Sequence, residues 1–101
     1  MIRRKRTEQR ERARAARRLV RDREKLAAMS PGGSADRPIG VPSSAVIEIR
    51  VRAMPCPQCG GRYKIKDHGS AGAGVRELSV VCEQCHVGRV LWFKIVPDEP
   101  N

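Results

Sequence analysis

The sequence predicts a small β domain of three to four antiparallel strands that follows a basic N-terminal α-helix. Three observations lead to this fold class. Residues 1–29 hold 12 basic residues and contain no Gly or Pro. Residues 45–96 contain short stretches in which apolar and polar residues alternate, and two Cys-x-x-Cys pairs lie within that region. A chain of 101 residues has room for one compact domain.

The basic arm, residues 1–29, is predicted to be helical because almost every residue from Arg3 to Met29 is a good helix former. It carries 12 basic and 4 acidic residues, so its net charge is +8 out of +10 for the whole chain. Several apolar residues recur at helical spacing in its second half and form a narrow stripe that would allow the helix to dock on the rest of the chain. They are Ala16, Leu19, Val20, Leu26 and Ala27.

Residues 30–44 contain three Pro, three Gly and four Ser and are predicted to be a flexible linker. The β domain is expected to span residues 45–96, and residues 97–101 are expected to be a disordered tail. Alternation of apolar and polar residues, or β-branched content, predicts the strands. The predicted strands are Ala45–Arg52, Arg62–Lys66, Val75–Val81 and Arg89–Val96, with a flexible hairpin tip at Asp67–Gly74.

The four cysteines form two pairs, Cys56 with Cys59 and Cys82 with Cys85, with 22 residues between the inner two. Two residues between ligands let a tight turn aim both sulfurs at one ion, so two such turns supply four thiolates, the closed tetrahedral set of a structural Zn²⁺ site. Thiolate ligation also suits an iron centre, and paired cysteines also serve redox chemistry. A thioredoxin-type role would require a βαβ context, which the pattern does not show. One structural Zn²⁺ is therefore the predicted cofactor.

These residues resemble the zinc-ribbon module, in which one Cys-Pro-x-Cys-Gly turn and a second Cys-x-x-Cys turn are joined by a β-hairpin. The resemblance covers residues 54–96, and the pattern is similar to that of small uncharacterised bacterial zinc-ribbon proteins. Ribbons occur in ribosomal proteins, transcription factors and RNA-modifying enzymes, so the module implies a scaffold and no particular task. The sequence departs from it at His86, where a ribbon often has glycine, and either a strained turn or a different backbone arrangement is expected there.

The last predicted strand is apolar on both faces, with Leu91 and Phe93 on one and Val90, Trp92 and Val96 on the other. Something should cover the second face. Either the chain itself does so, through the apolar stripe of the arm or the linker, or a partner protein docks there. Val90, Trp92 and Val96 are accordingly the candidate partner-binding residues.

The arm is rich in arginine, which accounts for 16 of the 21 cationic residues of the chain. Guanidinium groups bind phosphates through two hydrogen bonds and stack on bases, so the arm predicts association with nucleic acid, RNA more than DNA. The candidate phosphate-binding residues are Arg3, Arg4, Lys5, Arg6, Arg10, Arg12, Arg14, Arg17, Arg18, Arg21 and Arg23. The alternative is a protein-interaction module that docks through the strand around Trp92. No nucleophile, base and oxyanion site can be assembled, so an enzyme and a small-molecule substrate are not expected.

Charged residues interrupt every apolar stretch before Ser30, so neither a signal peptide nor a membrane span is expected, and the predicted location is cytoplasmic. Residues 30–101 hold 9 basic and 7 acidic residues, a net charge of +2, which four thiolates with one Zn²⁺ would cancel. Any long-range attraction to polyanions must then come from the arm.

Overall fold

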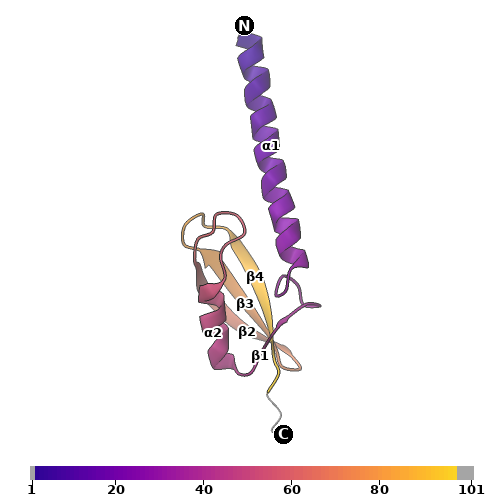
Figure 1. The fold of residues 1–101 in the computed structure, drawn as a ribbon, viewed down its shortest axis with the longest axis vertical. Helices are drawn as coiled ribbons and strands as arrows, with labels where there is room; N and C mark the ends of the chain where they lie inside the picture. Colours follow the sequence, from indigo (N-terminus) through magenta and orange to yellow (C-terminus); the bar gives the residue numbers. More distant parts are fainter. Residues whose placement is uncertain (1, 98–101) are drawn as a thin grey trace.

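A long helix, α1 (Ile2–Met29), projects from one side of a small body made of a sheet and a second helix, as the computed structural model of the chain shows (Figure 1). The structure describes the backbone of residues 2–97 and the side chains of residues 5–97. The molecule measures 72 × 23 × 22 Å, and its length comes from α1, which extends far beyond the body. The predicted basic helix is therefore present over its whole described range.

The body contains a four-stranded sheet in the order β1-β4-β3-β2. Its strands are β1 (Ile39–Val41), β2 (Tyr63–Gly72), β3 (Val75–Cys82) and β4 (Gly88–Ile95). β2, β3 and β4 form an antiparallel meander, whereas β1 pairs with β4 in parallel. The prediction of a purely antiparallel domain is thus wrong in one strand, because the chain enters the sheet at β1, crosses over through a helix and returns by the meander.

β1 lies within residues 30–44, the segment predicted to be a flexible linker. Val41 is buried, and its carbonyl accepts a hydrogen bond of 2.7 Å from the backbone N–H of Val96. The folded body therefore begins before residue 45. Three residues between prolines carry too little pattern to predict a strand, and only the pairing with β4 fixes their conformation.

The segment Ala45–Arg52, predicted as a strand, is a helix: α2 spans Ser44–Ala53. Ile47 and Val51, one helical turn apart, are 1% and 0% exposed, while Ile49 between them is 68% exposed. In a half-buried strand all three would share one face. The sequence fits both periods, and packing of the i, i+4 pair against the sheet selects the helix.

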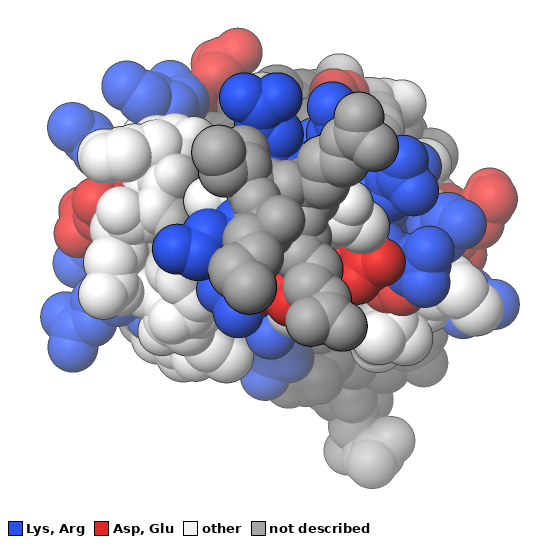
Figure 2. Space-filling model, turned by 90° about the horizontal axis from the view of Figure 1, so that it is seen from above, with Lys and Arg blue, Asp and Glu red and all other residues white. Residues whose placement is uncertain are grey.

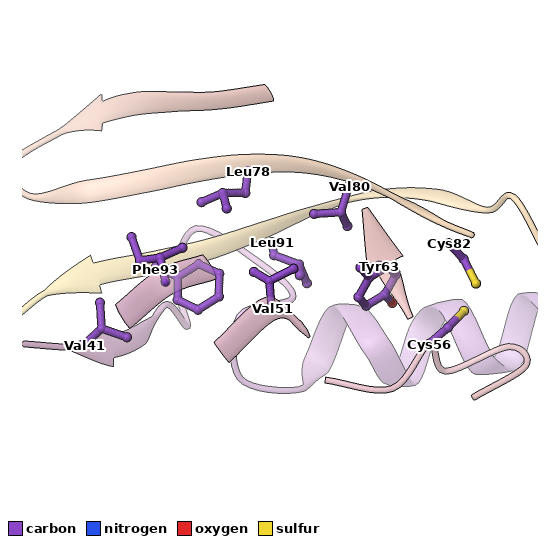
Figure 3. Close-up of a cluster of buried hydrophobic side chains, with 10 residues drawn as sticks. Val41, Val51, Cys56, Tyr63, Leu78, Val80, Cys82, Leu91 and Phe93 are labelled. Atoms are coloured by element: carbon purple, nitrogen blue, oxygen red, sulfur yellow. The ribbon is translucent and has the colours of Figure 1, made fainter. Parts of the chain in front are cut away.

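The core lies between α2 and one face of the sheet (Figure 3). Side chains from alternate positions of β3 and β4 point toward α2, and Cys56 and Cys82 close one end of the cluster with their sulfurs turned toward each other. The most deeply buried members are Ile47, Val51, Leu78, Cys82 and Phe93. Two of the four cysteines, Cys56 and Cys82, are therefore part of the core.

The hairpin of β2 and β3 is longer than predicted, since β2 continues through the expected flexible tip to Gly72 and the turn is made at Ala73 and Gly74. A register irregularity between Ile65 and Asp67 shifts the pairing by one residue. Such a bulge bends an edge strand locally. Asp67 and His68 thus belong to a paired strand and not to a loop.

Candidate metal centre

The four cysteines come from two turns at the same end of the body. Cys56 and Cys59 lie between α2 and β2, while Cys82 ends β3 and Cys85 lies in the turn that leads to β4. Their four Sγ atoms all lie within 4.8 Å of one another. The prediction that the four cysteines gather in one place is confirmed, and their sulfurs are close enough to share a metal ion.

The sulfur separations can be compared with a tetrahedron. Cys56 Sγ lies 3.7 Å from Cys85 Sγ, and Cys59 Sγ lies 3.4 Å from Cys82 Sγ. Four sulfurs bonded at about 2.3 Å to a central ion would be about 3.8 Å apart. A disulfide requires about 2.05 Å, so these separations do not correspond to disulfides. The geometry fits four thiolates around one ion.

Backbone amides surround the sulfurs on the protein side. Gly61 N–H points to Cys59 Sγ, and the N–H groups of Gln84 and Cys85 point to Cys82 Sγ, each at 3.4 Å. The Cys85 and Gln84 amides lower the pKa of Cys82 to about 6, although burial opposes them. The N–H of Val87 lowers the pKa of Cys85, but partial desolvation and the neighbouring sulfurs outweigh it and raise that pKa above its usual value. The backbone N–H groups therefore favour the thiolate form of Cys82 without the help of a bound cation.

The two turns have matching backbones. Gly60 follows the second cysteine of the first turn with φ of 76°, and its N–H donates to Cys56 O at 2.7 Å. His86 occupies the equivalent place in the second turn with φ of 64°, and its N–H donates to Cys82 O at 3.0 Å. Of the two alternatives at His86, the structure has the strained turn: the histidine adopts the glycine conformation, at a cost in backbone strain.

Neither histidine belongs to the metal cluster. Among the described residues, Cys56, Cys59, Cys82 and Cys85 form the one group of three or more His, Cys, Asp or Glu side chains close enough to share an ion. Cys56 and Cys82 are buried and the other two cysteines are exposed. All four members of the cluster are therefore cysteines, and two of them lie inside the core.

The first cysteine turn also contacts α1. The side-chain amide of Gln58, which lies between Cys56 and Cys59, donates to Glu24 Oε2 at 2.6 Å and to Val20 O at 3.0 Å. In return Arg23 donates to Gln58 O at 3.0 Å. The first cysteine turn and the last turns of α1 are thus joined by hydrogen bonds.

A second contact comes from β4, where the Arg89 guanidinium forms an ion pair of 2.6 Å with Glu24 Oε2. The Arg89 side chain is only 10% exposed and lies over the Tyr63 ring at 5.9 Å from its centroid. Burial raises the pKa of Tyr63, so the phenol beside this pair stays neutral. Sequence reasoning missed Glu24, Gln58 and Arg89, because nothing in the local pattern links residues up to 65 positions apart.

The loop after α1 turns back sharply onto β4. Gly32 O accepts the N–H of Trp92 at 2.8 Å. A Cβ atom on Gly33 would lie 1.9 Å from Ala27 O, so only glycine fits this close approach. These backbone contacts place the last turns of α1 beside β4.

The predicted phosphate-binding residues lie along the projecting helix. The side chains of residues 5–22 are all exposed, whereas Arg23 is half-buried in its contact with the first cysteine turn. The side chains of Arg3 and Arg4 lie outside the described residues. Figure 2, seen from the N-terminal side, shows Lys and Arg side chains on several sides of the molecule and fewer Asp and Glu.

The candidate partner-binding residues are less exposed than those of α1. Val90 and Trp92 are half-buried on the face of β4 opposite α2, and Val96 is 52% exposed. The apolar stripe of the arm does not cover this face in full, since Leu19, Val20 and Leu26 are 49%, 50% and 66% exposed. Docking of a partner around Trp92 stays a prediction.

No protein-family model, curated protein or solved structure matched this chain. Within residues 2–97, no helix has both the length and the apolar character needed to cross a membrane. A function for the chain must therefore be inferred from its own residues and their geometry.

Proposed function

We propose that the four cysteines bind one structural Zn²⁺ and that the protein is a non-enzymatic nucleic-acid-binding protein, with RNA preferred over DNA, that grips phosphates through α1. The observation that carries this proposal is the arrangement of arginines on α1. Those spaced by three or four positions lie along one side of a helix. This basic face comprises Arg6, Arg10, Arg14, Arg17 and Arg21, all exposed.

The basic face offers a regular line of guanidinium groups. Between Arg6 and Arg21 it runs for about 22 Å at 1.5 Å per residue. Two of the acidic residues, Glu8 and Glu11, fall on another side of the helix by the same spacing, and Glu24 is paired with Arg89. The charge directed along this face is therefore almost purely positive, which suits a polyanion with evenly spaced phosphates.

The body supplies a fixed base for the helix. α1 meets it through Gln58 and Arg89, next to the cysteine turns, while the side chains from Lys5 to Leu19 are exposed to solvent. A closed set of four thiolates is typical of structural zinc, and metal binding in so small a body should be coupled to folding. Zinc would thus organise the end of the helix that must be anchored.

In the test, the zinc-loaded protein is titrated into a labelled single-stranded RNA or the matching DNA. Binding is measured by fluorescence anisotropy over a range of salt concentrations. Removing two cations from the basic face, Arg10→Gln with Arg14→Gln, should weaken binding and reduce the slope of log affinity against log salt by about 1.4. The matched control, Lys5→Gln with Arg12→Gln, removes the same charge from another side of the helix. Glutamine keeps the helix propensity in both.

Equal losses in the two double variants would mean that only net charge matters and that the basic face has no special role. Affinity that survives deletion of residues 1–29 would remove the basis of the proposal.

A further inference from the structure

A cleft of about 590 Å³ lies beside β4, between the last turns of α1 and the segment Met54–Pro57. It exists because β1 pairs with β4 only from Phe93 onward, which leaves the preceding part of that edge without a strand neighbour. Its walls are mainly apolar, with contributions from Leu26, Pro31, Met54, Pro57, Leu91 and Trp92. A cleft of this size and character is large enough for a small molecule or for one group of a larger ligand.

One buried polar group in the wall of the cleft lacks a partner. Arg89 lines it, and the Nε atom of Arg89 is buried without a hydrogen-bond partner among the described residues. The terminal nitrogen of the same guanidinium is used by Glu24, which also lines the cleft. A buried N–H donor without an acceptor is costly, so a ligand oxygen or ring nitrogen that reached Arg89 would supply a hydrogen bond that the described residues do not.

The cleft lies at the end of the basic face. Glu24, which lines the cleft, follows Arg21 by three positions, so the two side chains are neighbours on the helix surface, about 4.5 Å apart along its axis. A strand whose phosphates follow the basic face would therefore reach the cleft without leaving the protein surface. The Arg89 donor and the Glu24 carboxylate are the kinds of group that read the acceptors and amino groups of base edges.

We propose that this cleft takes one unstacked base of a single-stranded nucleic acid whose backbone lies along the basic face of α1. This inference rests on the proposed function and adds the part of the ligand that the cleft recognises. It favours single strands over duplexes, because bases in a duplex are stacked and paired and cannot enter a side cleft.

Trp92 is the only tryptophan of the chain and lines the cleft, so its fluorescence reports on this site alone. The zinc-loaded full-length protein is titrated with a ten-nucleotide single-stranded RNA, with its duplex, and with an abasic strand of the same length and charge. The base-containing strand should change Trp92 fluorescence and bind about tenfold more tightly than the abasic strand, the effect of stacking one base.

Arg89→Lys keeps a cation opposite Glu24 but removes the Nε donor, and it should reduce the preference for the base-containing strand while leaving the salt slope unchanged. Arg76→Lys is the matched control, because Arg76 Nε is also buried without a partner but Arg76 does not line the cleft. A second pair covers the case in which Arg89→Lys fails to fold. Leu26→Glu places a charge at the exposed rim, and Leu19→Glu places the same charge on α1 away from the cleft.

Equal affinity for the base-containing and abasic strands, with no change in Trp92 fluorescence, would overturn the cleft proposal while leaving the phosphate-binding function intact. The cleft proposal is equally overturned if Arg89→Lys and Arg76→Lys, or the two glutamate variants, have equal effects. If no strand binds at all, the proposed function fails and this inference fails with it.

Discussion

Replacing Ile47 and Ile49 one at a time distinguishes the helix α2 from the strand that the same residues could form. Ile47 is 1% exposed and Ile49 is 68% exposed. Ile47→Ala removes three buried carbons, about 2.4 kcal/mol at about 0.8 kcal/mol for each. A cavity contribution brings the expected loss in the free energy of unfolding to about 3–4 kcal/mol. Ile49→Ala removes an exposed side chain and should gain about 0.4 kcal/mol from helix propensity.

The assay is urea and thermal unfolding followed by circular dichroism at a fixed excess of zinc, because bound metal contributes to the apparent stability. For a domain of this size a loss of about 3 kcal/mol lowers the Tm by about 12 °C or more. If Ile47→Ala does not fold, Ile47→Val should still cost about 1 kcal/mol. Equal destabilisation by the two alanine substitutions would refute the helical packing and favour a strand with both isoleucines on its buried face.

Three further outcomes are expected. Because residue 86 has positive φ, His86→Gly should raise the free energy of unfolding in urea by about 0.5–1 kcal/mol, and His86→Val should lower it by about 1 kcal/mol. A lower free energy of unfolding in His86→Gly would contradict this. Chelation should unfold the body, and a melting curve unaffected by chelation would exclude a structural metal. Zinc affinity, measured by competition titrations, should fall as pH is lowered. The fall should be steeper below about pH 6, where Cys82 takes up a proton. Gln58→Ala should speed amide hydrogen exchange in the last turns of α1, whereas Gln84→Ala, at the same place in the second turn, should not; identical exchange in both would mean that Gln58 does not anchor the helix.

The cysteine cluster could be predicted from the sequence because it depends on the spacing of residues that are close together in the chain. Two residues between cysteines favour a turn that brings both sulfurs together, so the four members of the cluster could be named without knowing the fold. The arm was readable for a similar reason, since helix propensity is a property of each residue. At His86 the sequence left two outcomes open, a strained turn or a different backbone, because the preference for glycine there does not show which one a histidine adopts. The structure has the strained turn, with the hydrogen bond from His86 N–H to Cys82 O.

The errors share one physical origin. β1 has no strand signal of its own and exists through its pairing with β4, and residues 44–53 satisfy two periods at once until the sheet selects one. The contact of Glu24 with Gln58 and Arg89 joins three distant parts of the chain, so it is a property of the assembled fold. Tertiary interactions decide where local preferences are weak or divided.

The separation of α1 from the core has a consequence for how the sequence can change over time. From Lys5 to Leu19 every side chain is exposed, so substitutions there leave the packing that keeps the body folded unchanged and, under the proposed function, change only the binding of phosphates. Selection on this stretch would act on helicity and on the positions of its charges. Selection on the body would act on the volumes of the core side chains and on the four cysteines. The two parts can therefore drift independently, and ligand preference can be retuned without loss of stability, up to the point where Glu24 meets Arg89 and the constraints on the two parts join.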